Sequence, residues 1–135
     1  MNGHVVIVGG GRVGRHAAEQ LLEERCTVTI IERDPEKTGS LSGTAGEVIE
    51  GDGSDPDVLA AADPEEADVV AALTNDTEVN LAVCELAREF APEARTVLRI
   101  ARDGEQAYGH REIVDDVVYP AAAGADVAVK RITRV

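Results

Sequence analysis

Glycines near the start of the sequence have a spacing that suits phosphate binding. Gly9, Gly11 and Gly14 form the pattern G-x-G-x-x-G between a short aliphatic run, 4–8, and a stretch with helical periodicity, the context that the pattern requires. The first glycine permits a tight turn, the second lets a pyrophosphate approach the backbone, and the third lets helix pack on strand. We therefore expect this glycine turn (residues 9–14) to close over the phosphates of an adenine dinucleotide at the positive end of the helix. The remaining residues of the turn are expected in the same site: Gly10, Arg12 and Val13.

An acidic residue follows the glycine turn at the sequence separation expected for a carboxylate that binds a ribose. Glu32 ends the next β-branched run, 27–32. A carboxylate there accepts hydrogen bonds from the ribose hydroxyls and repels a 2′-phosphate, which favours NAD over NADP. The neighbouring Arg33 leaves that preference open, because an arginine can contact such a phosphate or stack on adenine. A solvated charge at the end of a strand is the alternative role for Glu32.

Two further loops are expected at the same edge of the sheet. Asp52 and Gly53 follow a third predicted strand, and Thr74 and Asn75 follow a fourth. Ligands bind outside the carboxyl ends of the strands in open α/β sheets, so the first loop should flank the adenine and the second should lie at the switch point. Asp52 and Asn75 can equally be a turn residue and a helix cap.

The side chains that would move a proton in a dehydrogenase are not evident. Tyr108 and Tyr119 have no lysine four residues later, where Glu112 and Ala123 stand, and His110 has no evident partner. The sequence therefore indicates a binding module and not an enzyme. Two alternatives remain: a small NAD-dependent oxidoreductase whose substrate site a partner chain completes, and an acidic scaffold without a ligand.

Short aliphatic runs alternate with helical patterns along the chain. The predicted strands are 4–8, 27–32, 47–50, 67–73, 96–101 and 116–119. The predicted helices are 12–24, one opened by Asp34-Pro35, 55–62, one capped by Asn75 or Asp76 that runs to 90, one near 104–108 that ends at Gly109, and 121–135. This alternation predicts a Rossmann-like α/β fold, a doubly wound parallel sheet of about six strands with helices on both faces. No linker or repeat divides the chain, so residues 1–135 are expected to form a single domain.

The charge is strongly acidic, with 26 acidic against 13 basic residues and a formal net charge of −13. The acidity is spread along the chain, which suits a solubility surface and also a protein that works at high salt, where carboxylate repulsion is screened. A nucleic-acid partner is disfavoured, because binding to the phosphate backbone needs a basic face.

Cysteines, histidines and hydropathy exclude several other classes. Cys26 and Cys84 are too few for a disulfide framework or zinc site and are expected in the core, and the three histidines lack metal-ligand spacing. No apolar run approaches the roughly 20 residues that span a bilayer, and no signal peptide is visible. The chain is therefore expected to be cytoplasmic and not membrane-embedded.

Taken with these motifs, the sequence resembles the nucleotide-binding lobe of potassium-conductance regulators, the TrkA-N or RCK-N domain family. The resemblance covers residues 5–120 and is carried by VVIVGGGRVGRHAAEQLLE, TIIERDPE, VIEGDGSDPDVL, ADVVAALTNDTEVNLAVCELA and VLRIAR. The combination of GDGSDPDVL with ALTNDTEVN is more specific than the glycine pattern. The second lobe that usually follows in such regulators is not part of this sequence, and no regulation through it is claimed.

The resemblance implies a regulatory subunit or domain that binds NAD(H), with ATP or ADP as alternatives. It further implies dimers within a ring, beneath a membrane potassium transporter or channel subunit. By position it implies that Asp52 borders the adenine, that Thr74 and Asn75 line the phosphate side, and that Arg99 reaches the ligand. Arg99 alone could also be a partly buried ion-pair arginine. The resemblance makes 121–135 the place of a crossover or dimerisation helix.

Overall fold

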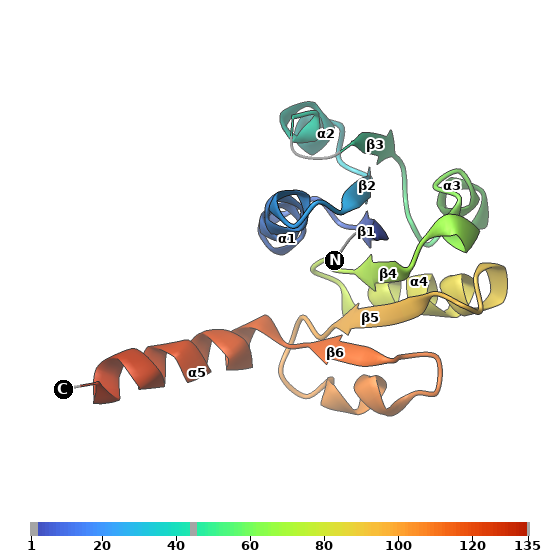
Figure 1. The fold of residues 1–135 in the computed structure, drawn as a ribbon. Helices are drawn as coiled ribbons and strands as arrows, with labels where there is room; N and C mark the ends of the chain where they lie inside the picture. Colours follow the sequence, from blue (N-terminus) through green and yellow to red (C-terminus); the bar gives the residue numbers. More distant parts are fainter. Residues whose placement is uncertain (1–2, 44–45, 135) are drawn as a thin grey trace.

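Six parallel strands form one sheet in the computed structural model, which describes residues 3–43 and 46–134 (Figure 1). The spatial order of the strands is β3-β2-β1-β4-β5-β6. Their bounds are β1 His4–Val8, β2 Thr27–Glu32, β3 Glu47–Glu50, β4 Val69–Ala72, β5 Arg95–Arg99 and β6 Asp116–Val118. The chain moves outward from β1 to β3 and then returns to β4 on the other side of β1, so the direction of winding reverses between β1 and β4. The predicted fold class is confirmed.

Helices cover both faces of the sheet (Figure 1). Their bounds are α1 Arg12–Glu23, α2 Pro35–Leu41, α3 Pro56–Ala60, α4 Thr77–Phe90 and α5 Pro120–Thr133, with 3₁₀ turns η1 Pro64–Glu66 and η2 Gln106–His110. Successive side chains of a strand point to opposite faces. In β1, Val5 and Ile7 pack in the cluster that includes Ala18 of α1, whereas Val6 and Val8 pack in the cluster that includes Leu59 of α3. The strand is buried on both faces from Val5 to Val8, and all of these residues are aliphatic.

Aspartate side chains begin three of the helices. Asp34, Asp55 and Asp76 accept hydrogen bonds from the first turns of α2, α3 and α4, which satisfies amides that a helix end leaves without partners. Of the two predicted caps of α4, Asp76 is therefore the one that acts, since its Oδ1 lies 3.0 Å from the Glu78 amide and 3.3 Å from that of Val79. Asn75 is exposed beside it.

Several predicted boundaries are wrong by one or two residues, and one element differs in kind. The helix expected near 104–108 is the 3₁₀ turn η2, which contains Gly109 instead of ending there. Its amides bond three residues back, from Tyr108 to Glu105 and from Arg111 to Tyr108, so no α-helical turn forms. The last helix starts at Pro120, one residue earlier than predicted, because proline suits the first turn of a helix. Val135 of the predicted helix lies outside the described residues.

Helix α5 projects from the end of β6, away from the rest of the sheet (Figure 1). None of its residues is buried, and Val129 and Ile132 expose 56% and 74% of their surface. Its apolar side chains therefore lack a covering element among the described residues.

Candidate functional site

A cleft of about 980 Å³ lies at the carboxyl ends of β1 to β5, where the sheet reverses its winding. Of the residues predicted from the sequence to form the site, all but Gly14 line this cleft: Gly9, Gly10, Gly11, Arg12, Val13, Glu32, Arg33, Asp52, Gly53, Thr74, Asn75 and Arg99. The structure thus brings the carboxyl ends of five strands to one place. Open α/β sheets bind ligands at such a switch point.

Each glycine of the motif answers a different constraint. Gly9 has φ +106°, and a Cβ atom there would lie 2.9 Å from the Thr74 nitrogen. At Gly14 a Cβ would collide with the Gly9 carbonyl oxygen, so this glycine lies under the turn and allows the helix to approach it. A Cβ at Gly11 would meet no protein atom within 4 Å. Gly11 therefore keeps open a space that faces the cleft.

Helix α1 begins at the cleft without a side-chain cap. Its N-cap is Gly11, and no acidic residue stands in its first turn. The α1 terminus also carries Arg12 and Arg15, which line the cleft. Because the first amides of a helix have no intrahelical acceptors, this end is suited to an anion.

Glu32 is fixed by the backbone at the end of β2. It is 6% exposed, so it is not a solvated charge. Its Oε1 accepts a hydrogen bond from the Gly10 amide at 2.7 Å, and its Oε2 accepts one from the Asp34 amide at 2.8 Å. Each carboxylate oxygen has a second lone pair, so the group can hold the glycine turn and still accept a hydroxyl from the cleft.

Asp52 is a turn residue that also lines the cleft. Its Oδ1 accepts hydrogen bonds from the hydroxyl and the amide of Ser54, at 2.7 and 2.9 Å, and so forms the turn after β3. These bonds lower the pKa of Asp52, the one from the hydroxyl most. Asp52 also lines the cleft, where its charge is held at neutral pH.

Arg99 reaches the cleft from β5 and makes no ion pair with any described residue. Its guanidinium donates to the Leu73 carbonyl at 3.2 Å, and its Nε is buried without a partner in the described part of the chain. Burial lowers the pKa of Arg99, and the positive charge of Arg12 lowers it further. Two like charges that lack a carboxylate between them favour a bound anion.

Asn80 organises the cleft and was not singled out from the sequence. This residue of α4 is fully buried, and its Oδ1 accepts from the amide and the hydroxyl of Thr74, at 3.0 and 2.6 Å. Its Nδ2 donates to the carbonyls of Thr74 and Arg99, both at 3.0 Å. A signal was present, because Asn80 shares the buried face of the helix with Thr77 and Cys84, where an apolar side chain is expected.

Other lining residues were also missed. They are Arg15, Lys37, Ser40, Pro120 and Ala121, among others. Polar residues on helices give no loop or motif signal, and Pro120 and Ala121 reach the cleft only because α5 begins there. The cleft thus gathers basic side chains in a protein of net charge −13.

Two kinds of feature are absent from residues 3–43 and 46–134. No group of three or more His, Cys, Asp or Glu side chains there could hold a metal ion. No helix in the same ranges is long and apolar enough to cross a membrane.

Comparison with known proteins gives a family and close relatives. The sequence profile of the TrkA-N domain matches residues 5–120. The Trk system potassium uptake protein TrkA homolog of Pyrococcus abyssi is 38% identical over 104 residues, which is 76% of this chain and 46% of the relative. A TrkA homolog of Pyrococcus horikoshii is 37% identical over 115 residues, 84% of this chain and 48% of that protein. The chain therefore spans about half the length of these curated relatives.

Solved structures share the fold. The TrkA-N domain of inner membrane protein ybaL from Escherichia coli superposes with a TM-score of 0.84 at 22% identity and covers 96% of both chains. The Kef CTD of Shewanella denitrificans, solved in an AMP-bound form, gives 0.80 at 21% identity, over 96% of this chain and 80% of that one. The GsuK channel bound to NAD gives 0.68 at 20% identity, over 87% of this chain and 21% of the channel.

Proposed function

Because the chain belongs to the TrkA-N domain family, we propose that it is a nucleotide-binding regulatory lobe that controls a potassium uptake system or channel. One observation carries the proposal. Arg12 and Arg99 face the cleft without carboxylate partners among the described residues, beside the uncapped start of α1. This combination suits a phosphate group better than any uncharged ligand. The relatives named as potassium uptake proteins supply the process that the lobe would control.

The proposed ligand is NAD(H), with ATP or ADP as the alternative. The position of Glu32 favours a ribose with free hydroxyls, since its carboxylate would repel a 2′-phosphate. Structures of similar fold bind NAD in the GsuK channel and AMP in the Kef domain, which supports an adenine nucleotide in general. In this proposal Asp52 and Gly53 flank the adenine, Asn75 lies on the phosphate side, and Arg33 borders the ribose.

We propose binding without catalysis. The candidate proton donors Tyr108, His110 and Tyr119 are not among the residues that line the cleft. Tyr108 instead packs against the core, with the Arg111 guanidinium 5.5 Å from its ring centre. A bound nucleotide would therefore act by favouring one arrangement of the lobe over another, which requires unequal affinity for the two.

Assembly into a homodimer or larger ring is proposed to use α5. Ala122, Ala125, Val129 and Ile132 recur at intervals of three and four residues, so they form one exposed apolar stripe. A second copy of the helix would cover it. The partner that this assembly would regulate is a potassium transporter or channel, at the cytoplasmic face of the membrane. The acidic net charge argues against a nucleic-acid partner.

Calorimetric titration tests the proposal directly. We expect one NAD, NADH, ADP or ATP to bind per chain in concentrated KCl, with no turnover when NAD is mixed with a panel of alcohol and aldehyde substrates. Absence of heat with all four nucleotides would remove the proposed function and favour an acidic scaffold. Hydride transfer to any substrate would favour the small oxidoreductase.

A further inference from the structure

Asn80 of α4 bonds to Thr74 and Arg99, two residues that line the cleft, without lining the cleft itself. We propose that Asn80 is a positioning residue that sets the relative places of Thr74 and Arg99 for nucleotide binding, an inference that rests on the proposed function. Its side chain is fully buried and is not among the residues that line the cleft, so its effect on a ligand must pass through its partners.

All four hydrogen bonds of the Asn80 amide go to the ends of β4 and β5. Two arrive at its Oδ1 from the Thr74 amide and hydroxyl, and two leave its Nδ2 for the carbonyls of Thr74 and Arg99. Buried amides with complete partners are strongly constrained, because any displacement leaves a polar atom without a partner. The loop after β4 and the backbone of Arg99 are therefore held by one side chain.

These bonds also decide which donors reach a phosphate. The amide and the hydroxyl hydrogen of Thr74 are both engaged by Asn80, so Thr74 offers the cleft no free donor. Arg99 is held at its backbone by Asn80 and at its guanidinium by the Leu73 carbonyl, which leaves its Nη2 group for a ligand, since Nε is buried. The donors that remain for a phosphate are therefore those of Arg99 and of the glycine turn.

Asn80→Asp separates positioning from simple structural support. The change keeps the shape but replaces Nδ2, the donor to two carbonyl oxygens, by an acceptor oxygen. When ionised, the introduced carboxyl would repel both carbonyls, and when protonated it would donate to one of them. Burial raises the pKa of such a carboxyl, so its ionisation falls within a measurable range.

The experiment measures dissociation constants for NAD and ADP between about pH 5 and about pH 8 in the wild type, Asn80→Asp and Asn80→Ala. The ratio of variant to wild type at each pH cancels the titration of the ligand itself. We expect the dissociation constants of Asn80→Ala to be about tenfold higher than those of the wild type at every pH, which is roughly the effect of losing one hydrogen bond. For Asn80→Asp we expect a ratio below about tenfold at low pH, where the neutral carboxyl donates to one of the two carbonyls, and above about tenfold at high pH.

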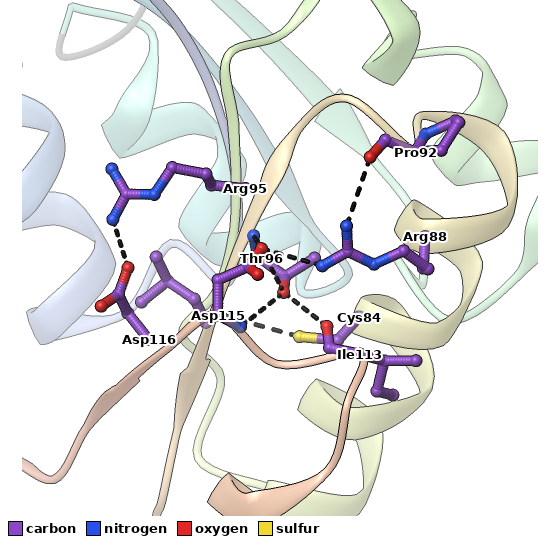
Figure 2. Close-up of polar contacts among 9 residues, drawn as sticks. Cys84, Arg88, Pro92, Arg95, Thr96, Ile113, Asp115 and Asp116 are labelled. Carbon is purple, nitrogen blue, oxygen red and sulfur yellow. Dashed lines mark hydrogen bonds and ion pairs between the residues drawn. The ribbon is translucent and has the colours of Figure 1, made fainter.

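A matched control exists in Thr96 of β5, which is also fully buried and hydrogen-bonded but lies outside the cleft. Figure 2 shows its hydroxyl donating to the Ile113 carbonyl and its amide donating to Asp115. Thr96→Val should lower the melting temperature and change the dissociation constants by less than about twofold, because distant sites act independently.

The outcomes distinguish the two proposals. If the wild type binds neither nucleotide, the proposed function and the role of Asn80 both fail. If the wild type binds and Asn80→Ala binds equally well, only the positioning role fails. A loss in Asn80→Asp that is the same at every pH, or a loss of equal size in Thr96→Val, would also overturn it.

Discussion

At the scale of single residues, hydrogen bonds within the protein determine which donors and acceptors of the cleft remain for a ligand. Glu32 accepts hydrogen bonds from the amides of Gly10 and Asp34. Asp52 accepts from the amide and the hydroxyl of Ser54, and the amide and the hydroxyl of Thr74 are both bonded to Asn80. Arg99 is the exception, because among the described residues its guanidinium donates only to the Leu73 carbonyl. The chemistry open to a ligand is therefore concentrated on arginine and on the amides of the glycine turn.

The first prediction concerns the positive charge of Arg99. Arg99→Gln should weaken nucleotide binding by about tenfold to a hundredfold, since hydrogen bonds to charged groups contribute about 1.5–3 kcal/mol. Calorimetry in constant KCl measures the change. Arg88→Gln serves as the control, because Arg88 pairs with Asp115 away from the cleft and should leave affinity unchanged. Equal losses in the two variants would point to a general effect of charge.

A second prediction concerns the carboxylate of Glu32. Glu32→Gln replaces one acceptor oxygen by an NH₂ group that would face the Gly10 or the Asp34 amide. We expect a loss of about 1–3 kcal/mol in the free energy of unfolding and a smaller preference for NAD over NADP. Chemical denaturation and paired titrations measure the two effects. Glu47→Gln changes an exposed residue at the start of β3, the end away from the cleft, and should alter neither the stability nor the preference for NAD.

At the scale of elements, the sequence predicts what depends on local pattern. The buried strands β1 and β2 were placed to the residue because their aliphatic runs end in glycine or charge, and Asp34-Pro35 and Asp55-Pro56 mark helix starts by a cap and a proline. The position of the motif loops at the cleft is predictable, because the carboxyl ends of parallel strands meet at one edge of the sheet.

Features that depend on tertiary partners were not predictable. No local sequence pattern indicates that Asn80 bonds to residues after β4 and in β5, or that Lys37 and Pro120 reach the same cleft. The 3₁₀ turn η2 was mistaken for an α-helix because a short segment carries too few residues to show its period. The use of Glu32 to brace the glycine turn likewise required the fold itself.

The third prediction belongs to the joint between β5, the loop before β6, and α4. The amide of Thr96 holds the pKa of Asp115 below its usual value, and Arg88 lowers it further (Figure 2). A carboxyl with a lowered pKa stabilises the fold above its unfolded pKa of 3.8, and this contribution is lost as the pH falls through the folded value. Asp115→Asn should therefore melt at a lower temperature than the wild type near neutral pH.

Acid should remove that difference. Melting curves from about pH 7 down to about pH 2.5 should converge for the two proteins, because the wild-type carboxyl becomes neutral. Asp103→Asn, which changes an exposed aspartate outside this joint, should run parallel to the wild type throughout. A constant difference between Asp115→Asn and the wild type at every pH would show that the ionised form is not what matters.

At the scale of the whole molecule, the exposed stripe on α5 makes an oligomer the expected state. Replacing Val129 and Ile132 together by Asp should convert the assembly to monomers, because charges in an apolar interface are costly to bury. Light scattering after size-exclusion chromatography gives the mass. Leu22→Asp is the control, since Leu22 is an exposed apolar residue of α1 outside the stripe. A monomeric wild type would contradict the proposed use of α5.

The last prediction follows from the charge of the whole chain. With a net charge of −13, carboxylates repel one another over the Debye length, about 10 Å at 0.1 M salt and about 3 Å at 1 M. Transfer from molar KCl to dilute buffer should therefore lower the melting temperature by several degrees, since roughly 1 kcal/mol shifts a domain of this size by about 3–5 °C.

Sucrose separates screening from general stabilisation, because it favours compact states without shielding charge. Equal protection by sucrose and KCl in dilute buffer would argue against carboxylate repulsion. The cleft should respond to salt in the opposite sense, since its arginines attract an anionic ligand that KCl screens. A rise in melting temperature together with weaker nucleotide binding on adding KCl would therefore place repulsion on the outer surface and attraction in the cleft.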